Sequence, residues 1–275
     1  MVYYKTEEEV ELIRQSCLLV CKALAHVASQ IKPGVTGVQM DALAEELIKD
    51  HNALPAFKGY RGFPSTLCIS VNEQVVHGIP TNIEFKDGDI VSIDCGTYMN
   101  EFFGDSAYTF ALGEISKETL QLLEVTNTSL YRGIGAAVSG QRIGDIGYAV
   151  QHYCEKTYNY GVVRELVGHG IGRSLHEAPE VPNYGKRGRG AKLKEGLVIA
   201  IEPMVNQGRK EVKQLDDGWT IASKDGTIAA HYEHTICVKK DKAIILSDHT
   251  LIEAEIKKNP NVNEIAIRSS ELVDV

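Results

Sequence analysis

Apolar residues recur at helical spacing near the start of the chain, and the first element they predict is a long helix. Thr6 and Glu9 form a capping-box signature, and the apolar positions then repeat over residues 10–31. A Pro-Gly pair ends this helix, and Thr36 is placed to cap a second one over residues 36–50. The chain therefore begins with two helices.

The rest of the pattern repeats this order of elements. Alternating and apolar runs predict strands over residues 66–71, 88–97, 102–112, 162–167, 197–205 and 227–239. Two more helices are predicted between them, over residues 117–138 and 143–158. The tripeptide His77-Gly78-Ile79 recurs as His169-Gly170-Ile171, although three residues can match by chance. Two helices followed by strands, twice over, indicate two related halves that share one sheet.

The composition is that of an ordinary globular protein, with 43% hydrophobic and 24% charged residues. A net charge of -8 argues against a broad basic face for nucleic acid. No uninterrupted apolar run approaches the roughly 18 residues of a membrane helix, and the acidic N-terminal segment lacks the layout of a signal peptide. A cytoplasmic protein is expected. The five basic residues of the loop 186–194 predict a solvated loop, with contact to RNA or an acidic partner as the alternative.

The six cysteines indicate neither a disulfide framework nor a zinc ribbon, because none form a C-x-x-C pair. Cys17 and Cys21 are four residues apart in a helical pattern, so we interpret them as part of one buried helix face. A metal role for these two thiols is the less favoured alternative.

Two aspartates flank a predicted turn and point to a functional site. Asp94 follows an apolar run, and Asp105 lies in the next strand. If the turn is centred between Met99 and Asn100, the aspartates are directly opposed on one face, with Cβ atoms about 5 Å apart. Facing like charges are unfavourable unless a cation lies between them or one is protonated. Solvated turn flanks are the alternative, which the apolar surroundings of Asp94 disfavour.

Two glutamates repeat this anomaly. Glu202 ends an apolar strand directly before Pro203, and Glu233 lies inside another apolar strand, on one face with His231. Neither apolar run around these acids, residues 197–201 and 229–238, contains a Lys or Arg that could pair with the acid. His169 lies between glycines, which let the backbone approach a ligand closely. Four carboxylates and one imidazole make an oxygen-rich site suited to divalent metal ions and unlike a thiolate zinc site.

Six motifs agree in order, spacing and identity with one known family. They are Val76-His77-Gly78-Ile79-Pro80, Asp94 with Gly104-Asp105-Ser106, Gly168-His169-Gly170-Ile171-Gly172, His176-Glu177-Ala178-Pro179, Ile201-Glu202-Pro203-Met204 and Tyr232-Glu233-His234-Thr235. On these motifs the chain resembles the bacterial type I methionine aminopeptidases. The resemblance implies an α+β protein with the pita-bread fold, a curved antiparallel sheet flanked by helices with internal pseudo-twofold symmetry. We expect one catalytic domain over residues 1–258 and a C-terminal extension of unknown order over residues 259–275.

The resemblance also implies a centre for two divalent ions, drawn from Co, Mn, Fe, Ni or Zn. One ion is expected on Asp94, Asp105 and Glu233, and the other on Asp105, His169, Glu202 and Glu233. Asp105 and Glu233 would then bridge the ions. A hydroxide between two such cations forms near neutral pH and attacks a peptide carbonyl. Glu202 is expected to act as the proton shuttle as well as a ligand.

The remaining site residues are implied by the same resemblance. His77 and His176 are expected to hydrogen-bond the scissile peptide and stabilise the tetrahedral intermediate. The wall of an apolar methionine pocket is expected to include Tyr60, Phe63, Cys68 and Trp219. Phe57, Leu175 and Arg61 depart from the better-known bacterial forms, where a histidine is familiar at the last position. His231 is placed to reach the surroundings of the ligands.

The implied function is that of a metalloaminopeptidase, a hydrolase that removes the N-terminal methionine from nascent polypeptides. A monomer without a membrane partner is expected, and transient contact with the ribosome stays open. A prolidase-like peptidase of the same fold is disfavoured, because roughly 60 residues before the first site motif leave no room for an extra domain. A type II enzyme would need an insertion between His176 and Glu202, which only 25 residues separate. A non-catalytic relative would have lost ligands, and all five are present.

Overall fold

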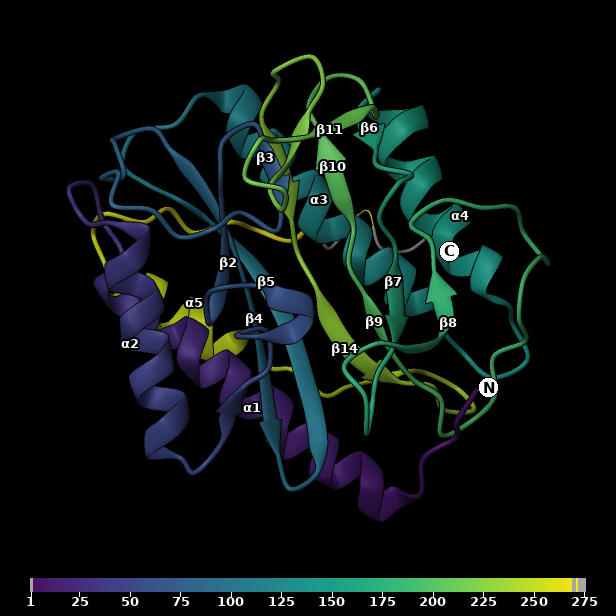
Figure 1. The fold of residues 1–275 in the computed structure, drawn as a ribbon. Coiled ribbons are helices and arrows are strands. Elements are labelled where there is room, and N and C mark those ends of the chain that lie inside the picture. Colours follow the sequence, from purple (N-terminus) through teal and green to yellow (C-terminus); the bar gives the residue numbers. More distant parts are fainter. Residues whose placement is uncertain (1, 269–270, 272–275) are drawn as a thin grey trace.

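Two pairs of helices, each followed by strands, organise the chain (Figure 1). The computed structural model describes residues 2–268 and 271 of the 275. The helices are α1 (Glu7–Gln30), α2 (Gly37–Asp50), α3 (Lys117–Ala136), α4 (Ile143–Gln151) and α5 (Thr250–Ile256), with a 3-10 turn at Tyr60–Gly62 and a π-helix at His152–Thr157. In Figure 1, α1, α2 and α5 lie with the first half of the chain, and α3 and α4 lie with the second.

The strands form four small sheets. In chain order they are β1 (Leu54–Pro55), β2 (Leu67–Val71), β3 (Gln74–Val76), β4 (Ile90–Met99), β5 (Phe102–Ala111), β6 (Gly161–Val162), β7 (Gly168–Gly170), β8 (Glu177–Val181), β9 (Val198–Ile201), β10 (Met204–Asn206), β11 (Val212–Gln214), β12 (Ile221–Ser223), β13 (Ala229–His231), β14 (His234–Cys237) and β15 (Ile244–Ile245). The sheet orders are β1-β4-β2 with β5 on β4, β15-β14-β9-β7-β8, β13-β10-β6 and β11-β12-β3. Every pair within these sheets is antiparallel.

The helix starts follow the sequence signals. The side chain of Thr6 accepts from the backbone N–H of Glu9, and the Glu9 carboxylate accepts from the N–H of Thr6. Thr36 and Gln39 make the same reciprocal pair at the start of α2. The helix predicted over residues 143–158 instead changes to π-helix after Gln151. Capping therefore predicted where helices begin, but not this change of helix type.

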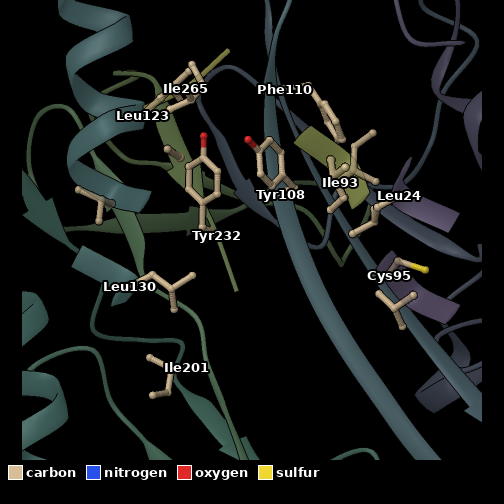
Figure 2. Close-up of a cluster of buried hydrophobic side chains, with 14 of the residues drawn as sticks. Leu24, Ile93, Cys95, Tyr108, Phe110, Leu123, Leu130, Ile201, Tyr232 and Ile265 are labelled. Carbon is tan, nitrogen blue, oxygen red and sulfur yellow. The ribbon is translucent and has the colours of Figure 1, made fainter. Parts of the chain in front are cut away.

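One hydrophobic core joins the two halves (Figure 2). Leu24 of α1 packs with residues of β4 and β5, and Leu123 of α3 lies on the far side of two tyrosines. The rings of these tyrosines, Tyr108 and Tyr232, meet edge to face with centroids 5.1 Å apart. By length and apolarity, α1 alone among the described helices passes for a membrane span, and 61% of that window is buried in the fold, as in a core helix.

The N-terminal segment before α1 is held against the loop that carries His176. Val2 forms an isolated bridge with Ala178. The Lys5 ammonium lies 2.5 Å from Oε2 of Glu177, and both side chains are at most 8% exposed. A buried ion pair at this point ties the first residues of the chain to the neighbours of His176.

The C-terminal extension predicted over residues 259–275 lies partly outside the described residues, which end at 268 apart from Glu271. The side chain of Asn259 donates to two carbonyl oxygens at the end of α1. The Arg268 guanidinium lies 2.7 Å from Oε2 of Glu124 on α3. The described part of the extension thus packs on helices of both halves, and the proposed division at residue 258 stays a prediction.

Candidate metal centre

The hairpin that carries the two aspartates has a different register from the predicted one. Its turn is formed by residues 100–101, both with positive φ. Asp105 consequently pairs with Gly96, and Asp94 pairs with Ala107. The prediction that the aspartates are directly opposed was wrong, because a two-residue turn with left-handed backbone suits the strand twist and lies one residue further on. The aspartates are diagonal neighbours, which still share one face of the sheet.

The two glutamates lie where neighbouring strands pass together from one sheet to another. Each strand predicted over residues 197–205 and 227–239 is broken at its glutamate, since β9 ends before Glu202 and β14 begins after Glu233. β9 pairs with β14 in one sheet, and β10 pairs with β13 in the next. Pro203 lacks the N–H that would continue the ladder, which favours a break there. Glu202 directly follows β9 and Glu233 directly precedes β14, so neither acid lies within a continuous strand.

Hydrogen bonds across the middle of the molecule attach these strand ends to β5. The N–H of Glu233 donates to the carbonyl of Ala107, and the Ser106 hydroxyl donates to the carbonyl of Glu233 at 2.7 Å. The hydroxyl of Thr235 donates to the carbonyl of Asp105 at 2.8 Å. Acids from the two halves are therefore held next to each other by one backbone–backbone hydrogen bond and two side-chain hydroxyls that donate to backbone carbonyls.

His169 lies on β7 with one ring nitrogen engaged and the other turned to the acids. Its Nδ1 lies 3.0 Å from the carbonyl oxygen of Gly170. Its Nε2 lies 3.8 Å from Oδ2 of Asp105 and 3.6 Å from Oε1 of Glu202. A Cβ at position 170 would lie 2.5 Å from the carbonyl oxygen of Ala178, so only glycine fits there. With Nδ1 protonated, the Nε2 lone pair faces the carboxylates, as a metal ligand requires.

The four carboxylates are buried together, and burial raises the pKa of each one. The pKa of Asp94 rises to about 7. Repulsion from neighbouring acids raises the pKa values of Asp105, Glu202 and Glu233 further. Burial lowers the pKa of His169 to about 4, so this ring is neutral at neutral pH. The four carboxyl groups therefore resist being ionised at the same time.

A divalent cation is what these side chains fit. Within the described residues, Oδ1 of Asp94, Oδ1 of Asp105 and Oε1 of Glu233 are buried without a hydrogen-bond partner. Ligand atoms of Asp105, His169 and Glu233 all lie within 4.8 Å of one another. Unpaired buried acceptors are costly, and a metal ion satisfies them while offsetting the repulsion between the carboxylates. Oxygen-rich donor sets of this kind suit hard and borderline divalent ions.

His77 is held at the same cavity by an unusual backbone. Its φ is 59°, in the left-handed region that few non-glycine residues adopt. The following glycine, Gly78, passes so close to β2 that a Cβ would lie 2.1 Å from the carbonyl oxygen of Ile69. Burial lowers the pKa of His77, which keeps its ring neutral and able to donate a hydrogen bond.

His176 lies on the other side of the cavity, beside a tyrosine. Its Nδ1 is 2.9 Å from the hydroxyl of Tyr60, and the two rings stack with centroids 5.3 Å apart. The ring of His169 is 4.2 Å away, centroid to centroid. Burial of its ring, followed by the neighbouring His169 and Arg61, lowers the pKa of His176 to about 3. Two neutral histidines thus flank the carboxylates.

All predicted site residues line one cavity of about 200 Å³. Its apolar part contains the edge-to-face pair of Phe63 and Trp219, with centroids 5.2 Å apart. Phe57, Leu175, Arg61 and His231 also line it. Four lining residues were not predicted: Val76, Leu166, Val167 and Met204. The signals that could have found Val76 and Met204 are their places beside His77 and Glu202 in the motifs.

Comparisons with known proteins agree with this centre. Residues 11–240 match the model of Metallopeptidase family M24. The methionine aminopeptidase of Clostridium acetobutylicum is 48% identical over 248 residues, which are 90% of this chain and 99% of that protein. The crystal structure of methionine aminopeptidase from Thermotoga maritima has a TM-score of 0.88 at 41% identity and covers 90% of this chain and 100% of that one. The prolidase from Pyrococcus furiosus, with a TM-score of 0.73 at 24% identity, shares the fold over 65% of its own chain.

Proposed function

The chain belongs to metallopeptidase family M24, and we propose that its buried carboxylate centre holds two divalent ions with which it removes the N-terminal methionine from polypeptides. The architecture is the α+β pita-bread fold that the motifs predicted. The chain is a hydrolase of N-terminal peptide bonds, as its relatives of similar length are named. The proposal is carried by one carboxylate oxygen each of Asp94, Asp105 and Glu233, which among the described residues are buried without a hydrogen-bond partner.

We assign the ligands as follows. Asp94, Asp105 and Glu233 hold one ion, and Asp105, His169, Glu202 and Glu233 hold the other. Asp105 and Glu233 would contribute to both ions; their burial to at most 3% exposure and the proximity of their oxygens to His169 support this assignment. Mn, Fe, Co, Ni and Zn all accept a donor set of carboxylates and one imidazole, so availability decides among them.

Bound divalent ions supply Lewis acidity that acidifies a water molecule and polarises the scissile carbonyl. Glu202 takes the proton from the attacking water and returns it to the leaving amine. A carboxyl whose pKa is raised by burial is suited to exchange protons in this way near neutral pH. His77 and His176 donate hydrogen bonds to the scissile peptide, whose developing negative charge they stabilise from two sides.

Methionine selectivity comes from the apolar part of the cavity. Phe63 and Trp219 form one wall, and Tyr60 and Cys68 complete it. A small cavity lined by aromatic rings and a buried thiol suits an unbranched thioether, because sulfur makes favourable contacts with aromatic edges. The acids that line the same cavity would lie beside the free α-amino group, which only the first residue of a chain carries, and this restricts cleavage to the first peptide bond.

The substrate class has consequences for where the enzyme works. Nascent polypeptides carry their initiating methionine in the cytoplasm, so we place the enzyme there as a monomer. Transient contact with the ribosome follows from acting on chains that are still being made.

Hydrolysis of a Met-Gly peptide tests the proposal. The protein is first purified without chelators, and its metal is then removed. It is titrated separately with each of the five divalent ions and assayed for release of free methionine. Cleavage is expected only after metal is added, with a stoichiometry near two. Absence of cleavage by metal-loaded protein would refute the aminopeptidase assignment, and preferential cleavage of Xaa-Pro peptides would favour a prolidase-like activity.

A further inference from the structure

Arg61 occupies a rigid turn at the edge of the cavity. It lies in the 3-10 turn at Tyr60–Gly62 with a φ of 49°, between two glycines that also have positive φ. The N–H of Gly59 donates to the carbonyl of Phe63, and the N–H of Phe63 donates to the carbonyl of Tyr60. Left-handed backbone at an arginine persists only where the surrounding structure imposes it. The backbone of this turn therefore fixes the position from which the Arg61 side chain extends.

The cavity opens at Arg61. Of the residues that line the cavity, Arg61 and His176 are exposed to solvent, whereas the others are buried or partly buried. Among the residues that the structure describes, Arg61 is also the only Lys or Arg that lines the cavity. The mouth thus presents one permanent positive charge beside a neutral histidine.

This positive charge has no acidic partner among the described residues. Two other exposed cations are each paired with an acid: Lys58 lies 2.8 Å from Glu45, and Arg173 lies 2.9 Å from Glu101. The guanidinium of Arg61 instead lies 5.4 Å from the centre of the Tyr60 ring. Stacking on a ring leaves the N–H groups of a guanidinium available for a carboxylate.

The path of a substrate brings its later residues to this charge. If the proposed function holds, the methionine side chain enters the apolar part and the scissile carbonyl lies beside His176. The chain beyond that bond must leave through the mouth, past Arg61. An extended peptide rises by about 3.3 Å per residue, so the third or fourth residue comes within reach of an arginine side chain. We propose that Arg61 forms a subsite for an acidic side chain at the third or fourth residue of the substrate.

The preference is expected to be modest and sensitive to salt. Exposed ion pairs change binding by about two- to fivefold, and dissolved ions weaken them. Metal-loaded enzyme is assayed with amidated octapeptides that begin Met-Ala-Xaa-Gly and carry Asp, Asn or Lys at Xaa. We expect kcat/KM to be about fivefold higher for Asp than for Lys at low salt, and this ratio to shrink at about 1 M salt. Amidation removes the terminal carboxylate as a competing anion.

Two variants assign the effect to Arg61. R61Q is expected to level the three peptides, and R61E is expected to reverse their order. K58Q is the matched control, because Lys58 is an exposed cation on the same segment with its own partner, and it should keep the wild-type order. An Asp-to-Lys ratio near one in the wild type, or an unchanged ratio in R61Q, overturns the subsite. The Asn peptide distinguishes failure of the subsite from failure of the proposed function. If the metal-loaded enzyme does not cleave the Asn peptide, the aminopeptidase activity itself is refuted.

Discussion

The Nδ1 atom of His176 lies 2.9 Å from the hydroxyl oxygen of Tyr60, on a ring that stacks against the imidazole. The hydroxyl can fix which ring nitrogen of His176 carries the proton, because a histidine tautomer is set by the hydrogen bond of its other nitrogen. The same ring supports the Arg61 guanidinium on the mouth of the cavity. One tyrosine thus contacts the histidine that we propose to bind substrate, and the same tyrosine lines the cavity.

Replacing Tyr60 with Phe tests this orientation. The substitution keeps the stacking ring and removes the hydroxyl, so kcat is expected to fall about fivefold, as for loss of one hydrogen bond. Metal stoichiometry should not change, because Tyr60 is no ligand. Steady-state kinetics on a Met-Ala peptide measures the effect. A kcat equal to that of the wild type would show that the hydroxyl does not position His176.

Removal of Glu233 should remove metal together with turnover. As the proposed bridging ligand, Glu233 would contribute to both ions, and Glu233→Ala leaves the other three acids, Asp94, Asp105 and Glu202, with one ligand fewer for each ion. Elemental analysis after dialysis against the metal, with the variant's circular dichroism spectrum as a folding control, gives the stoichiometry. A stoichiometry equal to that of the wild type would exclude a bridging role.

His77→Ala separates substrate binding from metal binding. His77 lines the cavity, but among the described residues its ring forms no ion-pair contact with a carboxylate, whereas Nε2 of His169 lies 3.8 Å from Asp105 and 3.6 Å from Glu202. We expect full metal content and a kcat lower by about a hundredfold, the cost of losing one donor to the developing oxyanion. Loss of metal from this variant would reassign His77 as a ligand.

Metal binding should strengthen as pH rises from 5 to 8. Burial raises the pKa of Asp94 to about 7, and burial and repulsion between the acids raise the pKa values of the other three well above their usual range, so the metal-free centre holds protons that the metal must displace. Because these pKa values lie above those of the unfolded chain, the acids destabilise the metal-free fold increasingly as pH rises through this window. The gap in Tm between metal-loaded and metal-free protein should therefore widen with pH. A gap that is constant from pH 5 to 8 would contradict protonated ligands.

The ion pair between Lys5 and Glu177 should stabilise the fold more than a surface pair does. Lys5→Met leaves a carboxylate buried without its partner, which is expected to lower the free energy of unfolding by about 3 kcal/mol. Arg14→Gln is the control, since Arg14 and Glu11 are 41% and 48% exposed and should contribute within about 0.5 kcal/mol. Urea denaturation measures both. Equal effects in the two variants would show that burial does not strengthen the N-terminal contact.

The helices and the acids could be predicted because their signals are local. Thr6 and Thr36 each cap a helix with residues three positions away, and each acid is conspicuous in an apolar strand that lacks a cation. The register of the aspartate hairpin could not be predicted, because moving the turn by one residue changes every pairing and both turns suit the same alternation.

Other features depend on contacts between distant segments. The break at Glu233 follows from pairing with β9 and β10, about thirty residues earlier, and no residue near Glu233 marks it. Leu166 and Val167 line the cavity, yet along the sequence they are indistinguishable from core residues. An apolar side chain faces a cavity or the core according to what lies opposite, which only the fold determines.

The distribution of the proposed ligands along the chain sets when the enzyme can first act. Asp94 and Asp105 come from the first half, while His169, Glu202 and Glu233 come from the second, and hydrogen bonds between β5 and the residues around Glu233 bring them together. A chain still emerging from its own synthesis holds only the first two acids, which offer too few donors for either ion. If these ligands are the right ones, the metal centre can be completed only after Glu233 has been synthesised, and incomplete copies of this peptidase cannot cleave other proteins.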